Sequence, residues 1–433
     1  MMRRLALVFL LPAVLGAQQQ DIPDSARLTV DRIYAGSEFR SASLGPFAWL
    51  DDGSAYTTLE EPGDDRPGQD IVRHDARSGT RTILVPAARL VPAGDSVPLD
   101  IEDYSWSADG TRLLVFTNSE RVWRTNTRGD YWVLELATGK LQRLGGTAEE
   151  SAPSTLMFAK FSPDGNRVGW VRYGEHNIYV EDLASSRITQ LTSDGSRTTI
   201  NGTFDWVYEE ELGLQDGWRW SPDGQSIAYW QLDATGVRDF PLYITTDSLY
   251  AYTFEVQYPK AGETNSAGRV GVVSSSGGPT RWMDVPGDPR NNYIARMEWA
   301  RPVGRGAGSR ELVIQHLNRL QNTLRVMLAD VRTGAVRTVF AERDSTWVEQ
   351  FDELRFVNGG RDILWLSERS GWAHLYLMPR AGGRPRALTS GAFDVLGVPR
   401  VDTLGGWVYY IASPENPTQR YLYRVKLSRR GGG

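Results

Sequence analysis

The chain has 433 residues, no cysteine and a formal net charge of −5, from 48 Lys and Arg against 53 Asp and Glu. The absence of cysteine excludes disulfides and thiol catalysis. The slightly acidic balance, without a basic run, argues against nucleic acid as a partner. The histidines are scattered without metal-binding spacing, so we expect neither a metal nor another cofactor; they are His74, His176, His316 and His374.

The first residues have the pattern of a secretory signal peptide. Arg3 and Arg4 precede an apolar run that ends at Leu15, and two small residues follow. Because this run is shorter than a bilayer span, residues 1–17 are predicted to direct export, to the periplasm or beyond, and then to be removed. An uncleaved anchor is the alternative. No later segment is apolar for long enough to cross a membrane.

A recurring pattern organises the rest of the chain. Segments such as YSWSADGTRLLVF, AKFSPDGNRVGWV and WRWSPDGQSIAYW each contain an aromatic residue, an Asp-Gly turn and an alternating apolar strand, in that order. Four strands per repeat are typical of a propeller blade. We therefore predict that residues 18–433 form an all-β propeller of seven or eight four-stranded blades, with a β-sandwich array as the alternative. The aromatic markers recur at steps of 55 to 59 residues, apart from one step of 79 between the fourth and the fifth; they are Trp49, Trp106, Phe161, Trp220, Trp299 and Phe356.

Two stretches interrupt the repeat and are candidates for function. One contains DWVYEEEL, residues 205–212, and the other covers residues 232–262. The three glutamates can be the solvated first turn of a short helix that Asp205 caps. They can instead converge on a cation, because neighbouring carboxylates repel each other until one arrives. A peptide α-ammonium, with a pKa of roughly 7.7–8.0, would offer them three donors.

The glutamate motif FDWVYEEEL is similar to that of the dipeptidyl peptidase IV family, exopeptidases of the prolyl oligopeptidase clan. The similarity covers about residues 28–428 and includes VQYPKAG, SPDGQSIAYWQLDATGV, NRLQNTLRVMLADVRTG and SERSGWAHLYLM. This resemblance implies an N-terminal β-propeller and favours eight blades. It also implies that residues 232–262 form an arm that contributes to dimer contacts, so a homodimer is expected.

The resemblance implies roles for individual residues. Glu210 and Glu211 match the glutamates that bind the N-terminal ammonium of the substrate. Arg124 matches the arginine of a Trp-Arg pair that binds substrate carbonyl or carboxylate groups, a task suited to a guanidinium fork; a salt bridge between blades is the alternative. Phe351 matches a phenylalanine that packs beside the bound peptide, although ordinary blade packing explains it equally well. The next residue, Asp352, stands where the family often has arginine.

Catalysis in that family belongs to an α/β-hydrolase domain with a Ser-Asp-His triad. No G-x-S-x-G occurs in this chain, and none of its histidines matches the catalytic position of the family. By itself the chain is therefore predicted to carry no catalytic residue, and to bind and gate substrate for its own hydrolase domain, which these residues lack. The whole enzyme would be an exported serine peptidase that releases N-terminal dipeptides with proline or alanine second. Tripeptide release is a near alternative.

Two other functions remain open from the sequence. A free-standing exported propeller could bind peptides or protein partners without catalysis. A propeller glycosidase could use paired carboxylates, but such acids normally lie several ångströms apart on separate elements and not within one tripeptide.

Overall fold

The computed structural model describes residues 27–41, 45–50, 53–63, 66–146, 151–304 and 310–427. The predicted signal peptide, residues 1–17, lies outside these ranges. The chain divides into two units, Met1–Gly45 and Pro46–Gly433. Among its described residues, the first unit contains one short π-helix, η2 (Asp31–Ala35), with no buried residue. None of the helices in the described ranges is both long and apolar enough to span a bilayer.

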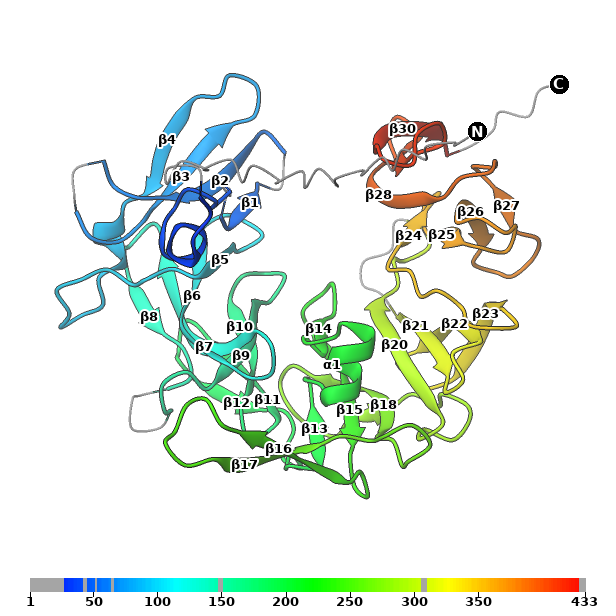
Figure 1. Ribbon diagram of the computed structural model, residues 1–433, viewed down its shortest axis with the longest axis horizontal. Coiled ribbons are helices and arrows are strands. Elements are labelled where there is room, and N and C mark those ends of the chain that lie inside the picture. The colour runs from blue at the N-terminus through cyan, green and yellow to red at the C-terminus, as the bar shows by residue number, and fades with distance from the viewer. Residues whose placement is uncertain are drawn as a thin grey trace, which may run out of the picture. The chain divides into compact units, whose positions relative to one another are not determined.

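The second unit is built of successive antiparallel strand sets, most of them with four strands (Figure 1). The first set is β1–β4: Phe47–Trp49, Ala55–Glu60, Asp70–Asp75 and Arg81–Val85. The second is β5–β8: Asp103–Trp106, Arg112–Arg121, Asn126–Glu135 and Leu141–Arg143. The third is β9–β12: Leu156–Phe161, Arg167–Arg172, Asn177–Asp182 and Ile188–Gln190. The second and third sets are joined into one eight-stranded sheet by pairing of β7 with β9. A short helix, η3 (Ala87–Leu90), follows β4.

The fourth set contains β13, β14, β15, β18 and β19: Thr199–Asn201, Trp218–Trp220, Ser226–Asp233, Ala267–Ser274 and Arg281–Trp282. Two insertions interrupt it: the helix α1 (Trp206–Leu212) and the hairpin β16–β17 (Asp239–Ile244, Tyr252–Gln257). The fifth set is β20–β23: Asn292–Trp299, Glu311–Asn318, Thr323–Asp330 and Val336–Arg343. The sixth is β24–β27: Leu354–Val357, Asp362–Ser367, His374–Pro379 and Arg386–Ala387. The last is β28–β30: Val395–Asp402, Trp407–Ala412 and Tyr421–Lys426.

The Asp-Gly turns have the same chemistry in three successive sets. In the turn after β5, Ser107 Oγ donates to Asp109 at 2.6 Å and Gly110 adopts a φ of 67°. Glycine accommodates this left-handed conformation without a steric penalty. The equivalent seryl-aspartyl bonds follow β9 and β14. These motifs are therefore structural turns, as predicted.

Three of the aromatic markers connect their set to the preceding one. Five of the six markers lie in the first strand of a set and Trp220 lies in the second strand of its set, β14; three of the six donate an indole hydrogen bond to the preceding set. Trp106 donates to Thr57 at 3.2 Å, Trp220 to the carbonyl of Lys160 at 3.1 Å, and Trp299 to the carbonyl of Arg219 at 3.3 Å. A side chain that packs on the neighbouring repeat is the expected device of stacked blades, since no blade can bury both faces alone.

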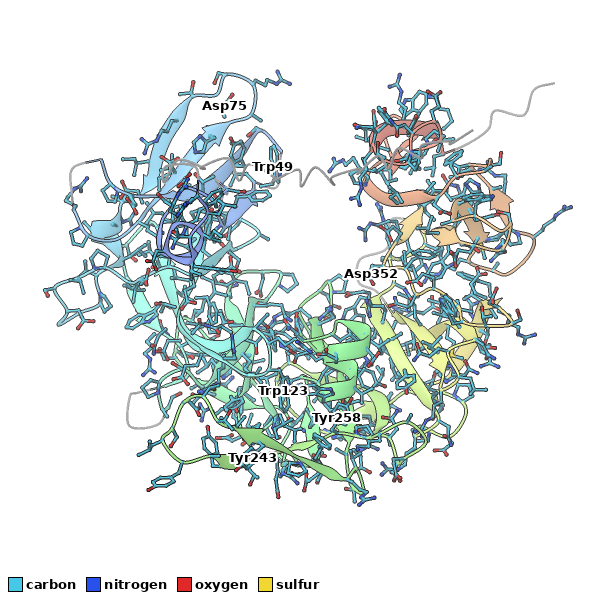
Figure 2. The ribbon with its side chains drawn as sticks, in the orientation of Figure 1. Trp49, Asp75, Trp123, Tyr243, Tyr258 and Asp352 are labelled. Carbon is cyan, nitrogen blue, oxygen red and sulfur yellow. The ribbon has the colours of Figure 1, made fainter. Side chains whose placement is uncertain are left out.

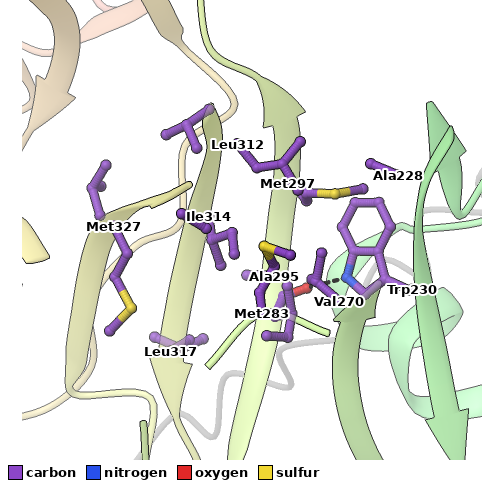
Figure 3. Close-up of a cluster of buried hydrophobic side chains, with 14 of the residues drawn as sticks. Ala228, Trp230, Val270, Met283, Ala295, Met297, Leu312, Ile314, Leu317 and Met327 are labelled. Atoms are coloured by element: carbon purple, nitrogen blue, oxygen red, sulfur yellow. Dashed lines mark hydrogen bonds between the residues drawn. The ribbon is translucent and has the colours of Figure 1, made fainter. Parts of the chain in front are cut away.

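The largest core cluster extends from the fourth set through the fifth to the sixth, and Figure 3 shows part of it. Trp230 on β15 is fully buried there, and its indole donates to the carbonyl of Ile294 on β20 at 2.9 Å. Met297, Leu312 and Ile314 pack in the same cluster. The predicted all-β propeller class is thereby confirmed; the number of blades stays a prediction.

Candidate functional site

The DWVYEEEL segment forms the helix α1, and its caps are encoded locally. Asp205 is the N-cap, and its carboxylate accepts from the backbone N–H of Tyr208 at 3.0 Å. Ser266 donates to the other carboxylate oxygen at 2.5 Å. Burial raises the pKa of the Asp205 carboxyl above its ordinary value. Gly213 ends the helix in a left-handed conformation, with a φ of 63°.

One side of α1 is anchored in the core. Tyr208 is fully buried, stacks on Phe204, and accepts a hydrogen bond from the backbone N–H of Ile294 at 3.1 Å. Leu212, one turn later, is buried as well. A Cβ atom at Gly268 would lie 2.5 Å from the hydroxyl of Tyr208, so β18 approaches the ring as closely as only glycine permits. The position of the helix is thus set by tertiary packing.

The three glutamates of α1 face three different surroundings. Glu209 is half-buried and accepts from Gln215 Nε2 at 3.1 Å; burial raises the pKa of its carboxyl. Glu210 is exposed and accepts from Arg124 Nε at 2.7 Å and from Arg124 Nη2 at 2.5 Å. These bonds hold the pKa of the Glu210 carboxyl below its ordinary value. Glu211 is exposed as well.

Glu211 lines a cavity of about 1250 Å³ beside α1. Aromatic side chains form part of the wall, including Trp206, Tyr258 and Tyr293. Arg319 also contributes to the lining. Trp206 and Tyr258 contact each other edge to face, with 5.6 Å between ring centroids. The cavity therefore combines one carboxylate with apolar walls and with two cationic side chains, Arg319 and Lys260. This composition suits a ligand that carries groups of both charge signs.

The tip of the β6–β7 hairpin lies against α1. The ring of Trp123 packs edge to face on Trp206, with centroids 5.3 Å apart, and Trp123 lies next to the helix in Figure 2. Arg124 forms the two-bonded pair with Glu210. Thr125 accepts from Gln215 Nε2 at 2.8 Å. Three consecutive loop residues therefore contact α1 or the segment directly after it, and two of the predicted site residues come together.

Phe351 lies in a different environment. It is partly buried against the core of the last two strand sets and lines a cavity of about 260 Å³ with Trp347. Its neighbour Asp352 accepts from Arg296 Nε at 2.5 Å, and Arg296 Nη1 donates to the carbonyl of Leu212 at 3.0 Å. The Phe351 segment is thus linked to the C-terminal end of α1 through Arg296. Sequence reasoning missed Arg296 and Gln215, because no local pattern distinguishes them from other surface residues.

In the described ranges, no three acidic or histidine side chains gather closely enough to hold a metal ion. The ring of His374 lies between the Thr389 hydroxyl, at 3.1 Å, and the carbonyl of Gly391, at 3.0 Å. His74 contacts Glu60 at 2.8 Å. These two histidines are therefore occupied by local structural contacts.

The fold and the helix-bearing insertion correspond to a known class, the propeller regions of dipeptidyl peptidases. The family described as the dipeptidyl peptidase IV (DPP IV) N-terminal region matches residues 107–432. The chain belongs to this family.

Individual relatives agree with this assignment. The "Probable dipeptidyl peptidase 4" of Aspergillus clavatus is 30% identical over 350 residues, which are 78% of this chain and 44% of that protein. The dipeptidyl peptidase 4 of Arthroderma otae is 28% identical over 383 residues, 85% of this chain and 48% of that protein. The crystal structure of Porphyromonas gingivalis dipeptidyl peptidase 4 superposes with a TM-score of 0.80 at 28% identity, covering 92% of this chain and 54% of that one. The chain thus spans about half the length of the relatives it matches.

Proposed function

We propose that this chain is the substrate-gating, N-terminus-binding propeller of an exported serine-type dipeptidyl peptidase. Glu210 and Glu211 bind the ammonium of the peptide, Arg124 binds a carbonyl or carboxylate group, and Phe351 packs beside the peptide. Hydrolysis, with release of dipeptides whose second residue is proline or alanine, belongs to the α/β-hydrolase domain of the whole enzyme. The observation that carries this proposal is the pairing of Arg124 with Glu210, next to the cavity that Glu211 lines.

The Arg124–Glu210 pair offers one positive and one negative group. This supports binding of a peptide both through its ammonium and through a carbonyl or carboxylate group. Glu210 is ionised at neutral pH, and Arg124 lowers its pKa further, so an acceptor is present for an incoming ammonium. Both side chains of the pair are accessible, with 68% of Arg124 and 32% of Glu210 exposed. Exposed ion pairs are weak, so a ligand that brings its own cation and its own acceptor can exchange with them at small cost.

The test compares a free with a blocked amine. The tripeptide Ala-Pro-Ala and its N-acetyl form are titrated into the 433-residue chain by calorimetry at pH 7. The free amine should bind at least about tenfold more tightly, because two charge-assisted hydrogen bonds depend on it. Glu210→Gln and Glu211→Gln should each remove most of this preference, and the exposed Glu415→Gln serves as the control. Equal binding of the two peptides to the unmodified chain would refute the proposed function.

We also propose that the chain forms a homodimer through the β16–β17 hairpin. This hairpin exposes apolar side chains in a short stretch: Tyr243 is 71% exposed, Leu249 92% and Tyr250 82%. Clustered exposed apolar groups are typical of contact surfaces. Leu249→Asp combined with Tyr250→Asp should shift the sedimentation coefficient from dimer to monomer, and an unmodified chain that sediments as a monomer would refute the dimer.

A further inference from the structure

The carboxamide of Gln215 connects the two elements that carry the candidate site. Its Nε2 atom has two hydrogens. One bonds to Thr125 Oγ1 at 2.8 Å, directly after Arg124, and the other bonds to Glu209 Oε1 at 3.1 Å, directly before Glu210. A single side chain thus contacts both neighbours of the Arg124–Glu210 pair.

Gln215 projects from a backbone that is fixed on both sides. On one side, Leu214 is buried and its N–H donates to the carbonyl of Tyr208 at 3.1 Å. On the other side, the carboxylate of Asp216 accepts from Lys160 Nζ at 2.5 Å and 2.6 Å. Gly217 then donates to the carbonyl of Gly202 at 3.0 Å. The carboxamide therefore extends from a rigid segment, whereas the loop tip that it contacts is exposed.

The loop that carries Arg124 needs such a support. Arg124 and Thr125 are both exposed, and an exposed ion pair by itself holds a loop weakly. The Trp123–Trp206 contact fixes the residue before Arg124, and the Gln215 bond fixes the residue after it. When a peptide ammonium takes the place of the arginine at Glu210, these two contacts are what keeps the loop next to α1.

The bond to Glu209 has a second consequence. It satisfies one carboxylate oxygen of the first glutamate, which is half-buried, whereas Glu210 and Glu211 are exposed. The ligand therefore meets two of the three consecutive glutamates, not all of them. This geometry accounts for a clamp formed by Glu210 and Glu211 in a motif that contains three acids.

We propose that Gln215 is a positioning residue for peptide binding: it holds the Arg124 loop at a fixed distance from α1 and withdraws Glu209 from the ligand. This inference rests on the proposed function. Displacements of about 1 Å at a binding group can cost large factors in affinity or rate. Loss of the bridge should therefore weaken binding of Ala-Pro-Ala about fivefold or more, with no change in the residues that touch the peptide.

The experiment uses a double-mutant cycle on the 433-residue chain. Gln215→Met keeps the length of the side chain and removes both donors, and Thr125→Val keeps the shape of the threonine and removes the acceptor. Gln142→Met, on β8, is the matched control. The amide of Gln142 also bridges a glutamate and a hydroxyl, since it donates to Glu181 at 2.9 Å and to Ser186 at 3.2 Å. Two quantities are measured for each variant: amide hydrogen exchange of residues 121–127 and the affinity for Ala-Pro-Ala and its N-acetyl form.

The inference predicts a specific pattern. Exchange in residues 121–127 should accelerate and free-amine affinity should fall in both single variants, and the double variant should be no worse than Gln215→Met, because the residues act through one bond. The Gln142→Met control should match the unmodified chain in both measurements. If Gln215→Met keeps normal loop exchange and normal selection of the free amine, the inference is overturned and the proposed function stands. If the unmodified chain binds both peptides equally, the proposed function falls, and the ligand role of the bridge falls with it.

Discussion

The two sides of helix α1 are built on opposite principles. On the buried side, Tyr208 and Asp205 make hydrogen bonds with Ile294 and Ser266, and both Tyr208 and Asp205 are buried. On the exposed side, Glu210 meets Arg124 in solvent. Buried polar groups are costly to leave unpaired, whereas exposed ion pairs contribute little to stability. The buried side therefore determines where the helix lies, and the exposed side is free to exchange partners with a ligand.

The strongest test of this contrast is Tyr208→Ala. Removing a fully buried aromatic ring should cost about 3–5 kcal/mol of unfolding free energy, because transfer and cavity terms add. Urea denaturation followed by tryptophan fluorescence measures the change. Tyr243→Ala is the control, since that ring is 71% exposed on β16 (Figure 2) and its loss should leave the midpoint almost unchanged. Equal effects at the two positions would remove the basis of the comparison.

A smaller loss is expected for Asp205→Ala. The substitution deletes the N-cap acceptor and leaves the hydroxyl of Ser266 without its partner, at a cost of about 1–3 kcal/mol. Asp205→Asn keeps a side-chain oxygen that can cap the helix, so it should lose less in the same denaturation experiment. If the alanine and asparagine variants unfold at the same urea concentration, the cap does not hold the helix as described.

The Lys160–Asp216 pair lies between the two extremes, since it is charged but largely covered. Burial lowers the pKa of Lys160 to about 8, from an ordinary value of 10.5. Between these values the unfolded chain binds more protons than the folded chain, so this residue should make stability rise with pH. The difference in unfolding free energy between the unmodified chain and Lys160→Met should therefore grow in favour of the unmodified chain from pH 8 to pH 10. A constant difference across this range would contradict the assignment.

The smallest effect on stability is expected for Arg124→Gln. The pair is exposed, so the urea midpoint should not change measurably. The pKa of Glu210 should rise towards its ordinary value, because the guanidinium that lowers it is gone. Carboxylate titration by NMR detects this rise. A large drop in stability would instead make Arg124 a structural residue, the salt-bridge alternative that the sequence left open.

Much of the fold was accessible from sequence because its signals are local. The aromatic markers, the Asp-Gly turns and the alternating strands are local patterns, and all six markers lie in strands. The short helix capped by Asp205 is confirmed by α1, but only Glu209 lies in its first turn, whereas that interpretation of the sequence places all three glutamates there. The roles of Glu210, Glu211, Arg124 and Phe351 in binding stay predictions.

The sequence by itself determined strand periodicity, turn chemistry and the cap of α1, since each depends on residues within a few positions of one another. Only the tertiary structure brought Arg124 to Glu210, across 86 residues, and Gln215 to Thr125, across 90. Contacts of this range depend on strand register and on the stacking of successive sets, which arise from many weak interactions together. The same packing separated three adjacent glutamates into three environments, which their order in the chain could not reveal.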